Sequence, residues 1–120
     1  MAEYLPETVA WLQRWGFCWK CKKRGFWPWT LSGHHLVRGT AKHKDDIKTI
    51  VILCPWCHMG DEHGTTDKCL GLLGSLVLKK RYDPANYDLS HVNAIRCRGP
   101  DAIQEAEVDA ESQRMEELGL

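Results

Sequence analysis

Four cysteines in two closely spaced pairs are the residues of this sequence with the clearest chemistry. Cys18 and Cys21 belong to the segment CWKC, and Cys54 and Cys57 belong to CPWC. The C-x-x-C spacing lets two thiolates of one tight turn bind the same tetrahedral ion. Two such pairs in one short chain predict a structural Zn²⁺ held by all four sulfur atoms.

Two other uses of the cysteines are alternatives. A redox pair of the thioredoxin type needs a βαβ pattern, which the sequence lacks. A disulfide framework needs an oxidising compartment, and the N-terminus has no basic region followed by a long apolar run. No apolar stretch is long enough to cross a bilayer, so we expect a cytoplasmic protein without membrane association. The remaining cysteines, Cys69 and Cys97, have no partner motif.

Histidines form the second group of reactive side chains. His34 and His35 are adjacent in LSGHHLVRG, while His58 directly follows Cys57 and His63 lies nearby. Neutral imidazole binds transition metals, and its ordinary pKa of about 6.5 lets it take a proton from water near neutral pH. If the extended segments, the second cysteine pair and a following helix pack together, one of the adjacent histidines would bind a cation with His58 and His63. The other would face water or substrate. His43 and His91 we interpret as ordinary surface residues.

This set of groups suits hydrolysis of a phosphodiester bond. One imidazole would activate the attacking water, and one divalent cation bound to the phosphate would act as a Lewis acid. Three imidazole ligands suit Zn²⁺, Ni²⁺, Co²⁺ or Mn²⁺ better than Mg²⁺, although metal availability in the cell can favour Mg²⁺ or Mn²⁺.

The zero net charge hides a division along the chain. Residues 1–82 hold 13 Lys and Arg against 7 Asp and Glu, whereas residues 83–120 hold 3 against 9. The basic part suits a polyanion such as DNA. Contacts to its phosphates would come from basic residues near the first cysteine pair and the histidines, namely Lys22, Lys23, Arg24, Arg38, Lys42 and Lys44. Phosphate contacts carry no base information, so we expect low sequence specificity on double-stranded DNA. Lys79, Lys80 and Arg81 would contact phosphate or complement a helix dipole.

The hydrophobic pattern predicts an α+β fold. Expected elements are helices over 6–16 and 65–82, extended segments over 26–37 and 47–54, a second helix before Gly99, and an acidic helix over 100–120 that barely packs. The corresponding division is an N-terminal helix (1–17), a core (18–82), a helical extension (83–98) and an acidic tail (99–120). The tail would be solvated or bind a protein partner. Trp27 and Trp29 would fill the core, with stacking on bases as the alternative.

Over residues 18–80 the sequence resembles the HNH nucleases of the ββα-metal fold. The matching segments are CWKC, GHH, TIVILCPWCH and the later His63. The resemblance implies a small ββα-metal core braced by the four-cysteine zinc, with His35 as general base. It makes His34, His58 and His63 the ligands of the catalytic cation, which would be Mg²⁺, Mn²⁺, Ni²⁺ or Zn²⁺. Family members include phage, mobile-element, restriction and toxin nucleases, which implies a bacterial or phage-encoded enzyme.

One position departs from the family pattern. Where the family has Asn, five residues before the first cysteine of the second pair, this chain has Thr49. Threonine keeps a hydroxyl but loses the amide donor, so Thr49 would give a tolerated variant, a slower enzyme or a domain without catalysis. The alternative function is therefore a catalytically weak or inactive zinc-knuckle module that binds nucleic acid. Asp46 lies close enough in sequence to supply a carboxylate instead, if the loop shifts.

Overall fold

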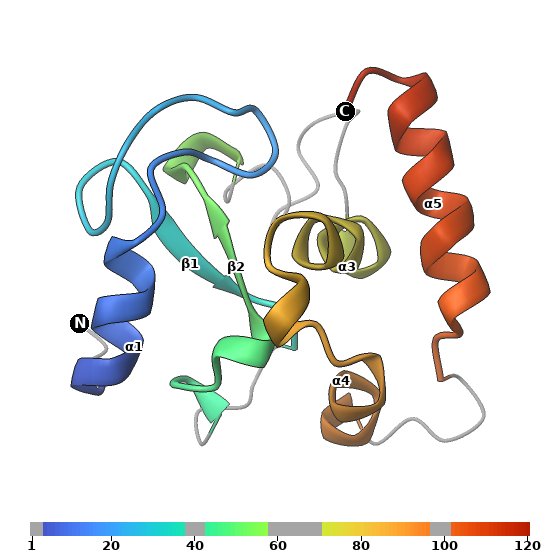
Figure 1. The fold of residues 1–120 in the computed structure, drawn as a ribbon, viewed down its shortest axis with the longest axis horizontal. Coiled ribbons are helices and arrows are strands. Elements are labelled where there is room, and N and C mark those ends of the chain that lie inside the picture. The colour runs from blue at the N-terminus through green and yellow to red at the C-terminus, as the bar shows by residue number, and fades with distance from the viewer. Residues whose placement is uncertain (1–3, 38–42, 58–70, 97–101) are drawn as a thin grey trace.

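The fold combines helices with a two-stranded antiparallel sheet, as the α+β prediction requires. The structure is a computed structural model that describes residues 4–37, 43–57, 71–96 and 102–120 of the 120-residue chain. Its elements are shown in Figure 1 and run in the order α1 (Pro6–Gln13), β1 (Ser32–His35), η2 (Ile47–Thr49), β2 (Ile50–Leu53), α3 (Gly71–Tyr82), η3 (Pro84–Asn86), α4 (Leu89–Arg96) and α5 (Glu105–Glu117). None of the described helices is long and apolar enough to cross a membrane.

Strands β1 and β2 form a short hairpin at the centre of the fold. Ser32 lies opposite Leu53 at one end of the ladder, and His35 lies opposite Ile50 at the other. Every side chain of β2 is buried. The loop of residues 17–24, which carries Cys18 and Cys21 and is called the knuckle below, borders one edge of the strand, and α3 packs against it (Figure 1). The knuckle contact is specific: the Trp19 amide donates to the Ile52 carbonyl at 3.0 Å.

The extended segments are shorter than the sequence predicts. Residues 26–31 form a tight turn, in which the amides of Trp29, Thr30 and Leu31 all donate to the Phe26 carbonyl. Residues 47–49 form a 3-10 turn instead of strand, since the Asp46 carboxylate accepts the Lys48 amide and caps that turn. In both places a nearby carbonyl or carboxylate oxygen accepts backbone amides that would otherwise bond to the neighbouring strand.

Gly33 allows α1 to approach the hairpin closely. A Cβ added at Gly33 would lie 3.0 Å from Ile50 Cγ2 and 3.3 Å from Leu12 Cδ2. Because side chains alternate along a strand, Gly33 and His35 share this face of β1, while His34 belongs to the opposite face. The GHH motif therefore places its two imidazoles on different sides of the sheet.

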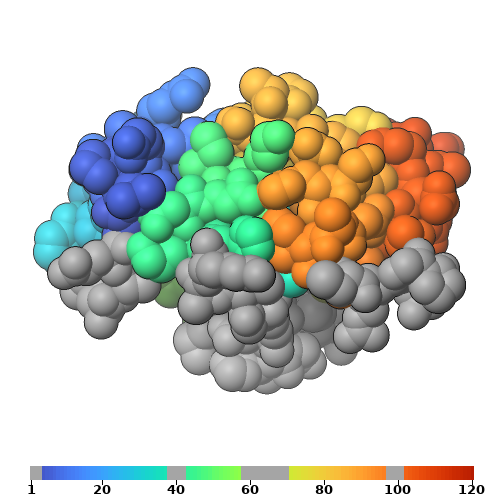
Figure 2. Space-filling view, turned by 90° about the horizontal axis from the view of Figure 1, so that it is seen from below, coloured from blue at the N-terminus to red at the C-terminus, as the bar shows by residue number. Residues whose placement is uncertain are grey.

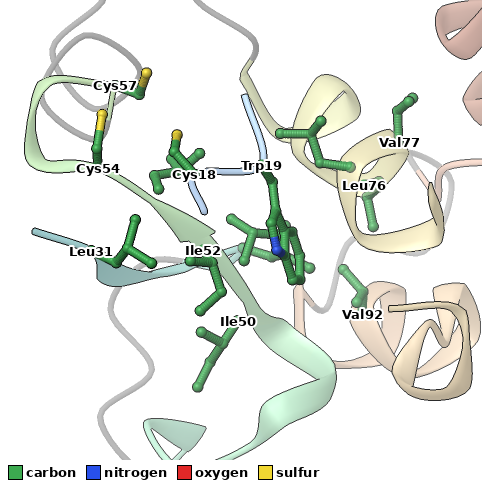
Figure 3. Packing of buried hydrophobic residues seen from close by; sticks show 14 of the residues in the cluster. Cys18, Trp19, Leu31, Ile50, Ile52, Cys54, Cys57, Leu76, Val77 and Val92 are labelled. Atoms are coloured by element: carbon green, nitrogen blue, oxygen red, sulfur yellow. The ribbon is translucent and has the colours of Figure 1, made fainter. Parts of the chain in front are cut away.

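Aromatic rings fill the space between α1, the knuckle and α3. The rings of Trp11, Trp15 and Trp19 meet edge to face, with centroids 4.9 to 6.4 Å apart, and Tyr82 of α3 stacks on Trp19. Figure 3 shows Trp19 between β2 and α3. Of the two tryptophans predicted to fill the core, Trp27 is partly buried against it, but the prediction is wrong for Trp29, which is 76% exposed.

The side chain of Lys79 is fully buried at the centre of this packing. Its ammonium group donates to the carbonyls of Ile47 and Ile50 and to the Asp83 carboxylate at 2.5 to 2.9 Å. It also lies 4.5 Å from the Trp11 ring centroid. Burial lowers the pKa of Lys79, and the hydrogen bond and charge of Asp83 oppose that effect. The phosphate contact predicted for this lysine is therefore wrong, whereas its position in the last turn of α3 agrees with the alternative prediction at the helix dipole.

Helix α5 packs more closely than the sequence indicates. Val108 and Met115 are fully buried against α3. Lys80 of α3 forms ion pairs with Glu105 and Asp109 at 2.9 and 3.0 Å, and Arg81 donates to the Leu120 carbonyl. The basic end of α3 is therefore paired within the chain, and the acidic segment is a packed helix.

We expect Lys79→Met to lower the free energy of unfolding by about 3–5 kcal/mol, because it strands buried carbonyls and a carboxylate without their cation. The neighbouring substitution Lys80→Met provides a matched control: its ion pairs are exposed, and its loss should cost less than about 1 kcal/mol. Urea unfolding of both variants measures the difference. Equal losses of stability would contradict the central role of Lys79.

Candidate metal centre and neighbouring histidines

The first cysteine pair lies on a tightly closed knuckle. The Cys18 amide donates to the Lys23 carbonyl at 2.9 Å, and the Lys22 amide donates back to the Cys18 carbonyl at 2.8 Å. Lys22 closes the tip in the left-handed region, with φ of 65°. A bridge between Phe17 and Arg24 joins the two arms of the knuckle. This geometry brings both sulfur atoms of the pair to the same side.

The second cysteine pair follows β2 directly. Cys54 comes immediately after Leu53, and residues 55–57 form one helical turn that carries Cys57. Because Trp19 of the knuckle is hydrogen-bonded to Ile52, the knuckle lies beside the end of β2 from which Cys54 emerges. The two pairs therefore meet at one end of the hairpin.

The four sulfur atoms lie close enough together to bind one ion. All lie within 4.8 Å of one another, and the Sγ atoms of Cys21 and Cys54 are 3.8 Å apart. Four sulfurs at about 2.3 Å from a zinc ion would be separated by about 3.8 Å. Cys18, Cys54 and Cys57 are buried and Cys21 is exposed, and all four are free thiols. Figure 3 shows the sulfurs of the three buried cysteines gathered beyond the end of β2.

The thiols polarise one another in a way that favours a metal. Burial raises the pKa of Cys18 and of Cys57, and for Cys57 the negative charge of neighbouring thiolates adds to the rise. At Cys54 burial also acts upward, but hydrogen bonds from Cys57, Cys21 and Cys18 outweigh it and lower the pKa. The lowered pKa of Cys54 favours a thiolate there, and a thiolate beside three further cysteines is a group that a cation can bind. The cluster can therefore hold a metal such as zinc.

His34 and His35 lie on β1, and the ladder places His35 at the end opposite the cysteines. His35 is half-buried, with its ring stacked on Tyr4 at a centroid distance of 6.5 Å. Its Nε2 lies 3.0 Å from the Lys44 carbonyl oxygen. A carbonyl only accepts, so Nε2 carries the hydrogen, and in the neutral ring Nδ1 holds the free lone pair.

Several predicted site residues lie outside the described residues: His58, His63, Arg38 and Lys42. Within the described ranges, the four cysteines form the one group of three or more side chains that could bind a metal. The predicted catalytic cation and its histidine ligands therefore stay predictions.

Thr49 is buried in the turn before β2. Its hydroxyl donates to the Asp46 carbonyl at 2.8 Å, and its own carbonyl accepts the Leu36 amide at 2.7 Å. The side chain thus fixes the turn that follows the loop carrying Lys44. The carboxylate of Asp46 binds the Lys48 amide and the ring of His91, so it does not replace the missing amide of an asparagine.

The basic residues predicted to contact DNA phosphates lie in different surroundings. Lys22, Lys23 and Arg24 are exposed on the knuckle. Lys44 instead forms an ion pair with Asp45 at 2.7 Å, and its ammonium group lies 5.6 Å from the centroid of the Tyr4 ring.

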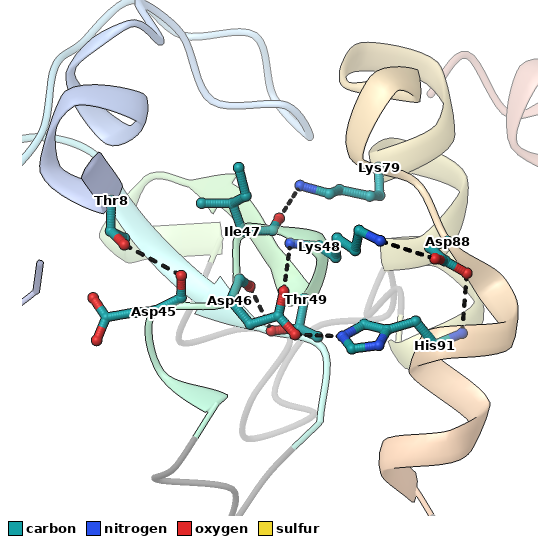
Figure 4. Close-up of polar contacts among 9 residues, drawn as sticks. All are labelled: Thr8, Asp45, Asp46, Ile47, Lys48, Thr49, Lys79, Asp88 and His91. Carbon is teal, nitrogen blue, oxygen red and sulfur yellow. Dashed lines mark hydrogen bonds and ion pairs between the residues drawn. The ribbon is translucent and has the colours of Figure 1, made fainter.

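A polar contact between α4 and the turn before β2 was not expected from the sequence. His91 binds the Asp46 carboxylate, and Lys48 pairs with Asp88 at 3.1 Å (Figure 4). On the face seen in Figure 2, the green segment of residues 43–50 lies against the orange α4 region. The interpretation of His91 as an ordinary surface residue is therefore wrong. The Asp88–His91 spacing, typical of a capped helix start, was the available signal, but it does not reveal Asp46.

Comparisons with known proteins assign no family to the chain. A scan against protein-family models, a search of curated proteins and a search of solved structures found no match. Its function is therefore inferred from the chain's own residues and their geometry.

We expect the purified protein to carry one zinc ion per chain, and a strong chelator to unfold it while a thiol reductant does not. Cys54→Ser should abolish zinc binding and most of the circular-dichroism signal of the folded protein, since binding of a structural metal supplies folding free energy. Cys69→Ser is the matched control, because Cys69 belongs to neither cysteine pair. Elemental analysis and circular dichroism measure both quantities. A fold that survives the chelator but not the reductant would favour disulfides.

Proposed function

We propose that this protein is a metal-dependent endonuclease of the HNH type that hydrolyses phosphodiester bonds in DNA. The observation that carries the proposal is the arrangement of the hairpin. Four thiols suited to zinc gather at one end, and at the other end β1 presents two histidines, one of them held by a backbone carbonyl. The order of these groups matches the segments CWKC, GHH and CPWCH on which the family resemblance depends.

His35 would act as the general base. Its Nε2–H is bound to the Lys44 carbonyl, so the proton from the attacking water would go to Nδ1. The hydrogen bond and the stacked Tyr4 ring hold the imidazole in one orientation, which reduces the cost of aligning it with the water. Among the described residues, Nδ1 has no hydrogen-bond partner that would compete with this water.

His34, on the opposite face of β1, would bind the catalytic cation together with His58 and His63. Three imidazoles suit Zn²⁺, Ni²⁺ or Mn²⁺, and Mg²⁺ can serve where it is abundant. When bound, the cation would supply Lewis-acid stabilisation of charge on the phosphoryl group and on the leaving oxygen.

Thr49 fits the role of a positioning residue. Its buried hydroxyl closes the 46–49 turn, and its carbonyl receives the Leu36 amide directly after His35. It thereby holds together the two chain segments on which the His35–Lys44 contact depends. Thr49 would therefore support the segments that position the general base, and the histidines would bind the catalytic cation.

Phosphate contacts would come from the exposed knuckle residues Lys22, Lys23 and Arg24, with Arg38, Lys42 and Lys44 near the histidines. These contacts would position the DNA backbone, which favours low sequence specificity. The expected setting is the cytoplasm of a bacterium, for a bacterial or phage-encoded enzyme. The exposed acidic side chains of α5 would be available to a protein partner.

A zinc-knuckle module that binds nucleic acid without cutting it is the second candidate. The observation that favours it is the use of the Thr49 hydroxyl within its own turn, which leaves no amide donor at that position. The two candidates differ in one measurable property, cleavage in the presence of a divalent cation.

We expect the protein to nick supercoiled plasmid with at least one of Mn²⁺, Ni²⁺, Zn²⁺ and Mg²⁺. His35→Ala should lower the rate by about 10²–10⁴-fold, the usual contribution of a general base, while zinc content and fold are retained. His43→Ala removes an imidazole outside the proposed set and should leave the rate within about twofold. Unchanged nicking by His35→Ala would reject the base assignment. An intact plasmid under all four metals, together with DNA binding, would select the second candidate.

A further inference from the structure

Three large aromatic side chains are exposed, two in the segment that follows the first cysteine pair and one within the second pair. Phe26 is 58% exposed, Trp29 is 76% exposed and Trp56 is 81% exposed. Burial of such rings is a main source of stability in a small domain, and the other tryptophans near the N-terminus are largely used that way. Three large rings left in solvent by one small domain indicate a contact surface.

The topology brings these rings to the same end of the hairpin. Ser32 begins β1 opposite Leu53, which ends β2, so residues 26–31 enter the ladder where residues 54–57 leave it. In Figure 1 both segments lie at the upper end of the hairpin, beside the knuckle.

Both segments that display the rings are held in fixed conformations. In the 26–31 turn the Phe26 amide donates to Thr30 Oγ1 at 2.9 Å, and a Cβ added at Gly25 would lie only 2.4 Å from that hydroxyl oxygen. Trp56 sits on the helical turn between two cysteines of the cluster. Rings fixed in this way lose little conformational entropy when a ligand stacks on them.

Cations on the knuckle indicate the kind of ligand. Lys22, Lys23 and Arg24 are exposed directly before the 26–31 turn, in the same stretch of chain as Phe26 and Trp29. Exposed rings bordered by basic residues are the features by which proteins bind unpaired nucleic acid: bases stack on the rings and the cations follow the phosphates. A protein partner for an apolar patch would not require the three cations.

We infer that the cysteine end of the hairpin is a binding surface for single-stranded nucleic acid, formed by Phe26, Trp29 and Trp56 with Lys22, Lys23 and Arg24. The inference rests on the proposed function, which supplies nucleic acid as the ligand. It adds the substrate class, which is DNA with unpaired bases beside the site of cleavage. It requires no catalytic step, so binding tests it separately from cleavage.

The test is fluorescence anisotropy with labelled oligo(dT) and with a duplex of equal length. It uses the zinc-loaded full chain carrying His35→Ala, without added cation. Trp29→Leu and Trp56→Leu should each weaken oligo(dT) binding about tenfold, the effect of losing one base–aromatic stack, and change duplex binding less than twofold. Trp29→Phe and Trp56→Phe keep an aromatic face and should stay within about threefold of the parent.

Two further readouts separate stacking from loss of structure. Oligo(dT) should quench tryptophan fluorescence, and either Leu variant should reduce that quenching. Lys22→Gln should lower the salt dependence of oligo(dT) binding by about 0.7 in slope, as expected for one phosphate contact to a single strand. Leu118→Ala, which truncates an exposed leucine at the end of α5, serves as the control and should change neither quantity. Zinc content verifies that each variant is folded.

Unchanged oligo(dT) affinity in both Leu variants would overturn the inference, and if duplex DNA were still bound and nicked, the proposed function would stand. Absence of binding to any nucleic acid would overturn both proposals. A concentration-dependent dimer that either Leu variant dissociates, measured by sedimentation, would assign the rings to self-association and reject the nucleic-acid surface.

Discussion

The meeting of the four thiols is the constraint on which the rest of the architecture depends. It joins the knuckle of residues 17–24 to the turn of residues 54–57, and the Trp19–Ile52 hydrogen bond extends that junction along β2. A two-stranded sheet has few ladder hydrogen bonds and is marginal alone. With the knuckle along its edge, β2 becomes a buried central strand, and β1 is thereby held with its histidines at the far end.

The buried ammonium group of Lys79 provides a second junction, separate from the cysteine cluster. Lys79 binds carbonyls on both sides of the change from η2 to β2, so it connects α3 to the turn that contains Thr49. Desolvation of the ammonium group is costly, and it is offset here by two carbonyls, Asp83 and the Trp11 ring. The same turn is held from the other side by His91 on α4. The loop preceding it, which carries Lys44, is therefore anchored from two helices.

The sequence predicted the parts whose signals are local. Paired cysteines indicated the metal cluster, Pro6 marked the start of α1, and the β-branched run before Cys54 indicated β2. The burial of Lys79 was not predicted, because a lysine side chain usually lies in solvent. Leu72, Leu76 and Lys79 nevertheless fall on one helical stripe. The packing of α5 was underestimated. Two buried residues, Val108 and Met115, are enough to hold the helix, because Lys80 of α3 also forms an ion pair with Glu105 of α5. Trp29 was assigned to the core because composition cannot distinguish a buried ring from a displayed one.

The two ends of the hairpin impose different physical demands, and this difference explains their composition. At the histidine end, a backbone carbonyl and a stacked ring hold His35 in one orientation beside a closed turn. At the cysteine end, a metal held by the four thiols would fix the short segments that display Trp29 and Trp56 to solvent. Because β1 and β2 are only four residues long, the separation between the two ends is about 10–13 Å, a few nucleotides of an extended strand. A single bound strand could therefore span both ends, with its phosphates near the histidines and its bases against the rings.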